Sequence, residues 1–196
     1  MYKVGITGGI GSGKSTVCGL LSAYGVAVYD SDTKAKALME QSVTLRESLC
    51  AVFGEECYNE DGLNRQYLAS KVFGDEQSLI KLNSIVHPAV RADFRSWAEQ
   101  QRGEYVVLES AILFEAAFET EVDTTLAVLA PVEERVRRAM GRDGADREAI
   151  LSRIQHQMSD EELHAKADRC LVNLRMDYLE SDVEQLHKIY LYEARR

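Results

Sequence analysis

A glycine-rich segment near the start of the chain has the residue types that bind phosphate groups. Residues 8–15 read Gly-Gly-Ile-Gly-Ser-Gly-Lys-Ser, which matches G-x-x-x-x-G-K-[ST] between an apolar run and a helical pattern. Glycine lets the backbone turn until successive N–H groups point at phosphate oxygens, and a helix N-terminus adds partial positive charge. The segment therefore predicts an ATP site formed by Gly11, Ser12, Gly13, Lys14, Ser15 and Thr16.

Two side chains of this segment indicate the chemistry. Lys14 has the reach to follow charge between the β- and γ-phosphates, and the Ser15 hydroxyl suits the coordination shell of Mg²⁺. We therefore expect ATP and Mg²⁺ as cofactors and Lys14 as a catalytic residue. The alternative is a glycine-rich turn that only joins a strand to a helix, and the complete match in the required context disfavours it. The chain contains neither Asp-x-x-Gly nor Asn-Lys-x-Asp, which excludes a switch GTPase of the usual kind.

A second polar group, Asp30-Ser31-Asp32, is predicted to end the second strand, beside the first. Carboxylates at i and i+2 of an extended chain point the same way. One of them is suited to orient or deprotonate an acceptor hydroxyl, or to hold a metal-bound water. For Asp32, a role at the acceptor hydroxyl and a role as helix cap are both open. Asp30 is expected to cap the helix or to support the site residues.

Arginines gather in the helical pattern that follows the fourth strand, namely Arg135, Arg138, Arg142, Arg147 and Arg153. Mobile cations that screen charge and exclude water are what a kinase lid provides. Arg142, beside a hinge-like turn, is the strongest candidate for catalysis and ATP binding, Arg138 is a further candidate for ATP binding, and Arg135 is the weakest of the five. The alternative is a solvated helix face that pairs with Glu133 and Glu134.

The elements expected to position these residues alternate along the chain. Five apolar runs predict parallel strands joined by helices, at residues 3–7, 26–29, 105–109, 125–130 and 169–173. Residues 33–102 show no convincing strand and predict a helical insertion, in which Pro88 opens a new helix directly after His87. His87 is interpreted as a cap or packed side chain, with substrate contact as the alternative. A last helix is expected from Asp177 to the end.

The bulk composition limits the partners. The 196 residues carry a formal net charge of −9, so nucleic acid and anionic membranes are disfavoured. The four cysteines form no metal-binding spacing and predict reduced thiols. No leader or membrane-spanning run is found, so we expect a soluble, cytoplasmic protein that is a monomer or a weak homo-oligomer.

Together these motifs resemble the dephospho-coenzyme A kinases, over nearly the whole chain. The resemblance rests on residues 7–16, on Asp30-Ser31-Asp32, on residues 82–88 (Leu-Asn-Ser-Ile-Val-His-Pro), on residues 113–115 (Leu-Phe-Glu), on the lid arginines with Gln157, and on Ala167-Asp168 with Asn173. Three departures are Ala111 in place of a proline, Glu109 where aspartate is common, and Leu174-Arg175 where the turn usually contains glycine.

The resemblance implies a P-loop NTPase-type α/β fold: a parallel five-stranded sheet flanked by helices, with a helical substrate-binding insertion and a helical lid. It implies a core at 1–32, 103–134 and 159–196, a CoA-binding insertion at 33–102 and a lid at 135–158. The acceptor would be the ribose 3′-hydroxyl of dephospho-CoA, with Asp32 as catalytic base and with Asp32, His87 and Arg147 binding substrate. The alternatives are another P-loop kinase, acting on a nucleoside monophosphate or a shikimate-like acceptor, and a nucleotide-binding regulator without transfer activity.

Overall fold

The fold is built on a five-stranded parallel sheet with the strand order β2-β5-β1-β6-β7. The structure, a computed structural model, describes the backbone of residues 1–196 and every side chain except that of Met176. The prediction of five parallel strands is confirmed within a residue or two of each boundary. The strands are β1 (Tyr2–Thr7), β2 (Ala27–Asp30), β5 (Tyr105–Glu109), β6 (Thr124–Leu129) and β7 (Arg169–Val172).

The sequence predicts that the second strand lies beside the first, and this prediction is wrong. β5 pairs with β1 on one side and with β2 on the other. The physical reason is burial, because the first four residues of β5 are fully buried whereas only one of the four β2 residues is. The more continuously apolar strand takes the inner position, where both of its faces are covered.

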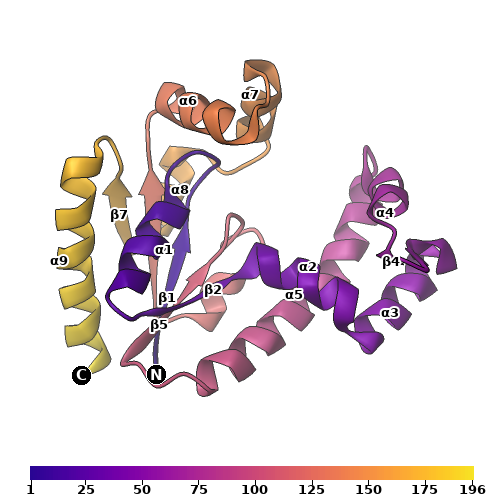
Figure 1. The fold of residues 1–196 in the computed structure, drawn as a ribbon, viewed down its shortest axis with the longest axis horizontal. Helices are drawn as coiled ribbons and strands as arrows, with labels where there is room; N and C mark the ends of the chain where they lie inside the picture. Colours follow the sequence, from indigo (N-terminus) through magenta and orange to yellow (C-terminus); the bar gives the residue numbers. More distant parts are fainter. The chain divides into compact units, whose positions relative to one another are not determined.

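Helices cover both faces of this sheet (Figure 1). One core packs strand residues such as Ile6 and Val128 against α1 (Lys14–Ala23) and α9 (Met176–Ala194). A smaller cluster on β6 packs against α8 (Asp160–Lys166). The predicted C-terminal helix therefore exists and packs back on the sheet.

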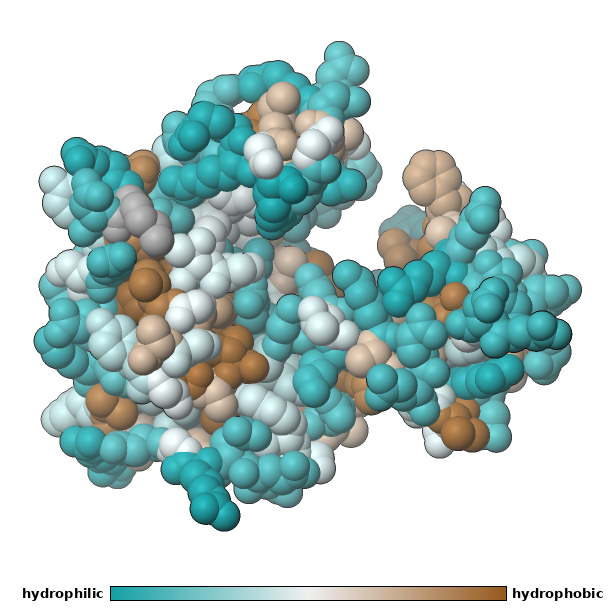
Figure 2. All heavy atoms as spheres, in the orientation of Figure 1, coloured by the Kyte–Doolittle hydropathy of each residue, from teal (hydrophilic) through white to brown (hydrophobic). Residues whose placement is uncertain are grey.

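Two further helices follow β6 in the same compact unit. α6 (Val132–Asp143) ends at Gly144 in the left-handed region, and α7 (Arg147–Gln155) starts from a hydrogen bond between the Asp146 carboxylate and the Ala149 N–H. Their apolar residues pack on one another, whereas hydrophilic residues cover most of their visible surface (Figure 2). Such amphipathic helices pack on their neighbours through an apolar stripe and expose polar side chains elsewhere.

The chain divides into two compact units, residues 1–30 with 97–196, and residues 31–96. The second unit is mostly helical but holds a two-stranded hairpin that the sequence did not predict, since strands of two residues show no alternation. Its elements are α2 (Ser31–Gln41), α3 (Val43–Phe53), η1 (Glu55–Cys57), β3 (Tyr58–Asn59), β4 (Gly62–Leu63), α4 (Arg65–Val72) and most of α5 (Glu76–Glu99). A last short turn, η2 (Phe118–Glu121), belongs to the first unit.

Pro88 does not open a helix, because α5 runs through it without a break. A proline inside a helix removes one hydrogen bond and costs about 3 kcal/mol. On either side of Pro88 the apolar positions stay in phase at four-residue spacing, and Val86, Val90 and Phe94 are all buried. Burying each such side chain contributes roughly 1.5–3 kcal/mol, which exceeds the loss at the proline.

Asp32 is helical and not extended, because α2 begins at Ser31, directly after β2. Its carboxylate lies in the first turn, where the helix dipole favours negative charge. The prediction that Asp30 and Asp32 share one side of an extended chain is therefore wrong. None of the helices, as far as the described residues extend, is long and apolar enough to cross a membrane.

Candidate active site

The glycine-rich segment forms a tight loop between β1 and α1. Gly8, Gly11 and Gly13 have φ values of 148°, 75° and 100°, which favour glycine over any residue with a side chain. A Cβ at Gly11 would meet the Arg135 carbonyl oxygen at under 3.0 Å, and one at Gly13 would meet the Asn173 side chain as closely. The spacing of glycines in the sequence therefore reflects close approach as well as backbone conformation.

Side chains from two distant segments hold the far end of the loop. Asn173, which follows β7, donates from its amide nitrogen to the Ser12 carbonyl oxygen at 2.9 Å. Arg138 on α6 donates to the same oxygen at 3.4 Å and to the Asn173 carbonyl oxygen at 3.1 Å. Because parallel strands end at the same edge of the sheet, β1 and β7 bring residues 12 and 173 together although the sequence separates them by 161 positions.

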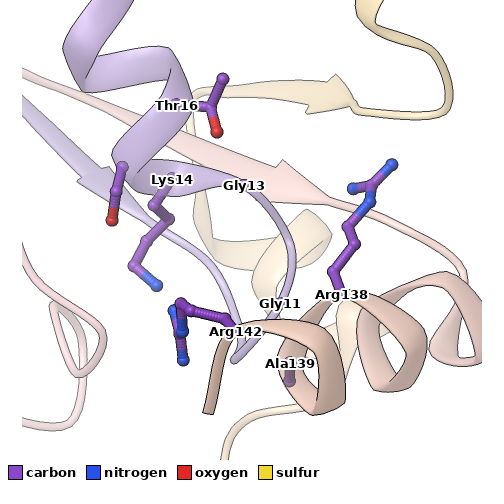
Figure 3. Close-up of a pocket in the computed structure, with 8 residues that line it drawn as sticks. Gly11, Gly13, Lys14, Thr16, Arg138, Ala139 and Arg142 are labelled. Carbon is purple, nitrogen blue, oxygen red and sulfur yellow. The ribbon is translucent and has the colours of Figure 1, made fainter. Parts of the chain in front are cut away.

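A pocket of about 260 Å³ opens beside the loop. Figure 3 shows Lys14 and Arg142 reaching toward the same space, while Arg138 lies across the loop from them. Lys14 donates to the Gly8 carbonyl oxygen at 2.7 Å, which keeps its ammonium group curled over the loop. The pocket is lined by Gly11, Gly13, Lys14, Ser15, Thr16, Arg138, Ala139 and Arg142. Its cations and helix N-terminus suit a polyphosphate.

The Ser15 hydroxyl donates to a carboxylate oxygen of Glu109 at 3.0 Å. Glu109 ends β5 and is paired in register with Asp30 of β2, so the two acidic residues are neighbours across the strands. Burial raises the pKa of the Cys18 thiol on the adjacent helix, and the nearby Glu109 carboxylate raises it further. Hydroxyl and carboxylate oxygens are the hard donors that Mg²⁺ prefers.

These oxygens fit a magnesium ion that arrives with a nucleotide. The described residues contain no cluster of three or more His, Cys, Asp or Glu side chains able to enclose a metal by themselves. Mg²⁺ does not require one, since it keeps several waters and takes most remaining ligands from phosphates. Ser15 and Glu109 are therefore the residues of this pocket region whose oxygens fit such an ion.

The arginines of α6 and α7 pair with carboxylates. Arg142 binds Asp143 at 2.7 Å, a hydrogen bond that raises the pKa of the guanidinium, and Arg153 reaches the same carboxylate at 3.5 Å. Arg147 binds Glu133 at 2.7 Å. Of the pairing with Glu133 and Glu134 that the sequence offered as the alternative, Arg147 of α7 pairs with Glu133 of α6, and Arg138 lies 3.9 Å from Glu134 on its own helix. Arg142 both pairs and lines the pocket.

The model of the dephospho-CoA kinase family matches residues 2–177 of this sequence. The chain belongs to the dephospho-CoA kinase family. It is 44% identical over 177 residues to the dephospho-CoA kinase of Salinibacter ruber, covering 88% of this chain and 89% of that one. It is 43% identical over 172 residues to the dephospho-CoA kinase of Bacteroides fragilis strain YCH46, covering 87% and 84%.

Solved structures share the fold of this family member. A crystal structure from Thermus thermophilus superposes with a TM-score of 0.83 at 40% identity, covering 98% of this chain and 97% of that one. The dephospho-CoA kinase of Campylobacter jejuni gives 0.66 at 23% identity and covers 95% of both chains. A shikimate kinase from Acinetobacter baumannii, solved with shikimate, gives 0.57 at 14% identity, covering 98% and 94%. At these two lower identities the likeness concerns the fold, which is that of P-loop kinases.

Several residues that the sequence places at the site do not line the described pocket. Asp32 and His87 belong to the unit of residues 31–96. His87 is in the middle of α5 and half-buried, and this burial lowers its pKa, with the Arg91 charge adding to the effect. Ser12 is buried within the loop and does not line the described pocket. Arg147 does not line that pocket either.

The sequence alone predicts no site role for Glu109, and it makes Arg135 the weakest candidate among the arginines. Glu109 carried a usable signal, because it is an acidic residue at the carboxyl end of a strand. Arg135 carried none, because an arginine that will be buried looks like its exposed neighbours on the same helix. In the structure it is the arginine closest to the loop backbone.

Proposed function

We propose that this chain transfers the γ-phosphoryl group of ATP to the ribose 3′-hydroxyl of dephospho-CoA, which yields CoA and ADP. The observation that carries the proposal is the phosphate pocket with Lys14, Ser15 and Arg142, in a chain whose relatives at 43–44% identity are dephospho-CoA kinases. The substrates are small molecules, ATP and dephospho-CoA.

The loop residues bind the polyphosphate of ATP. Backbone N–H groups at the start of α1 hold phosphate oxygens, and Thr16 and Arg138 complete the site. Lys14 exchanges the Gly8 carbonyl for a phosphate oxygen and stays with the charge as it moves toward the leaving group. Arg142 adds a second cation to the same space, where developing charge is best stabilised by groups already in place.

Ser15 provides a hydroxyl ligand for Mg²⁺, and Glu109 fixes the orientation of that hydroxyl. When bound, the ion supplies positive charge to the phosphate oxygens and helps to align them.

Asp32 acts as the base that accepts or orients the proton of the acceptor hydroxyl. His87 and Arg147 bind the acceptor, in keeping with the family motifs at residues 82–88 and in the lid. In this proposal residues 33–102 are the CoA-binding insertion, residues 135–158 are the lid, and residues 1–32, 103–134 and 159–196 are the core. We place the protein in the cytoplasm as a monomer or weak homo-oligomer, and four cysteines without disulfides suit that compartment.

The test is an acceptor panel. Purified protein with ATP and Mg²⁺ is offered dephospho-CoA, AMP, dTMP or shikimate, and ADP release is measured. We expect strong stimulation by dephospho-CoA and none by the other three. Equal turnover of AMP or shikimate would assign the chain to another kinase activity, and binding of ATP without turnover of any acceptor would assign it a regulatory role.

A further inference from the structure

Arg135 is a buried arginine packed against the glycine-rich loop. Its side chain is only 2% exposed. Its Nε donates to the Ile10 carbonyl oxygen at 3.0 Å, and one terminal nitrogen donates to Asp160 at 2.9 Å. The other terminal nitrogen has no hydrogen-bond partner among the described residues and lies where a Cβ on Gly9 would collide with it. Burying a guanidinium is unfavourable, so its contacts with the loop need an explanation.

Ile10, the loop residue that accepts a hydrogen bond from Arg135, is held by three contacts. The Ile10 N–H donates to the Gln157 side-chain oxygen at 2.8 Å, and the Ile10 carbonyl accepts from Arg135. The Ile10 side chain packs beside Val136 and Ile150 in the cluster formed by α6 and α7. Both peptide units that flank Ile10 are therefore fixed by side chains from residues 135–160.

The orientation of these peptides decides what the loop presents to a ligand. A trans peptide is planar, so its N–H points opposite to its carbonyl. Because the Ile10 carbonyl faces Arg135, the N–H of Gly11 points away from Arg135, and Gly11 lines the pocket. The positive φ at Gly11 leaves this peptide easy to turn over unless something holds it. A reversed peptide would aim a carbonyl oxygen, and not an N–H, toward a bound phosphate.

From this geometry we infer that Arg135 and Gln157 are positioning residues: by fixing the peptides on both sides of Ile10, they keep the Gly11 N–H in the orientation that donates to a phosphate. Asp160, the first residue of α8, keeps the Arg135 guanidinium in place. The inference rests on the proposed function only for the identity of the nucleotide and for the kinetic readout.

The test uses two variants. Gln157→Met keeps the length of the side chain but removes the oxygen that accepts from the Ile10 N–H. Arg135→Met removes the nitrogens that donate to the Ile10 carbonyl and to Asp160. ADP affinity is measured by calorimetry, and KM is measured for ATP and for dephospho-CoA. We expect ADP affinity to fall roughly 10-fold or more in each variant, since a hydrogen bond to a charged phosphate is lost or misdirected. KM for ATP should rise in step, whereas KM for dephospho-CoA should stay within about twofold.

Arg137→Met is the matched control, because Arg137 is on the same helix, is 70% exposed and pairs only with Glu134 among the described residues. Arg135→Lys, which keeps a positive charge and one donor nitrogen, should recover part of the ADP affinity that Arg135→Met loses. If Arg135→Met does not fold, Gln157→Met decides, because it leaves the Arg135–Asp160 pair intact.

Wild-type ADP affinity in Gln157→Met would overturn the inference. So would an equal rise of both KM values together with a lower melting temperature, because that pattern indicates general loosening. Wild-type protein that binds ADP but leaves dephospho-CoA unphosphorylated would refute the proposed function and would leave the ADP comparison as the test of the inference.

Discussion

Gly11→Ala and Gly25→Ala form a matched pair that tests how closely the glycine-rich loop is packed. Both glycines have positive φ values, 75° and 82°, so an alanine at either position pays the same backbone penalty of about 1–2 kcal/mol. A Cβ at Gly25 meets no atom within 4 Å. Its effect should therefore end with the backbone, as a fall of a few degrees in melting temperature with unchanged activity.

At Gly11 the new methyl group meets the Arg135 carbonyl oxygen, which belongs to the backbone of α6. The overlap is roughly 1 Å relative to ordinary van der Waals contact, and the obstacle is not the end of a flexible side chain. Relieving it adds about 1–3 kcal/mol to the backbone term, so unfolding should become easier by roughly 2–5 kcal/mol in all. If α6 moves away instead, its arginines leave the pocket, and a displacement near 1 Å lowers kcat/KM for ATP by about 10²-fold.

The assay pairs urea unfolding, followed by the fluorescence of the single tryptophan, with ADP release at saturating dephospho-CoA. We expect Gly11→Ala to fall well below Gly25→Ala in stability, in kcat/KM for ATP, or in both. Equal stability and equal kcat/KM in the two variants would refute the close packing of the loop on α6.

Three further predictions concern single side chains. Lys14→Ala should lower kcat by about 10²-fold or more with a smaller loss of ATP affinity, because backbone N–H contacts to phosphate survive; unchanged kcat would give Lys14 a structural role only. Asp32→Asn should lower kcat by roughly 10²–10⁴-fold with little change in melting temperature or ATP affinity, and near-normal turnover would remove Asp32 as the base. His87, whose folded-state pKa lies below its unfolded value, should make the protein less stable as the pH falls through 6.5, because the unfolded chain then binds the proton more readily. His87→Gln should flatten the dependence of unfolding free energy on pH between about 7 and 5, and an unchanged slope would contradict this assignment.

The parts of the fold that the sequence predicted are those fixed by local patterns. The strands are short apolar runs, of which β5 and β6 are almost wholly buried, and the residue types of the glycine-rich loop follow from its backbone geometry. The parts that it missed depend on the burial of residues that are distant in the sequence. Whether Pro88 ends α5 depends on the burial of residues one and two turns away, and the place of β2 depends on a comparison with β5, which lies about 75 residues further along the chain.

The site shows the same limit. Lys14, Ser15, Arg138 and Arg142 were predicted from type and spacing, and the structure brings them to one pocket. Arg135 has the same type and the same helical spacing but a different environment, since its side chain is buried against the loop backbone at Ile10. Burial of a polar side chain depends on which surface its helix meets, and residue type does not reveal that surface.

The charge distribution explains how an acidic protein presents a polyphosphate site. The formal net charge is −9, yet Lys14 and Arg142 line the pocket with Arg138. Arg142 pairs with Asp143 at 2.7 Å, a largely exposed pair of the kind that contributes at most about 1 kcal/mol. A nucleotide triphosphate that displaces this carboxylate therefore exchanges one weak ion pair for a bidentate contact with a more highly charged partner. If the proposed ATP site is correct, affinity comes from that exchange and from backbone N–H groups already oriented by their surroundings, so it does not require a protein of positive net charge.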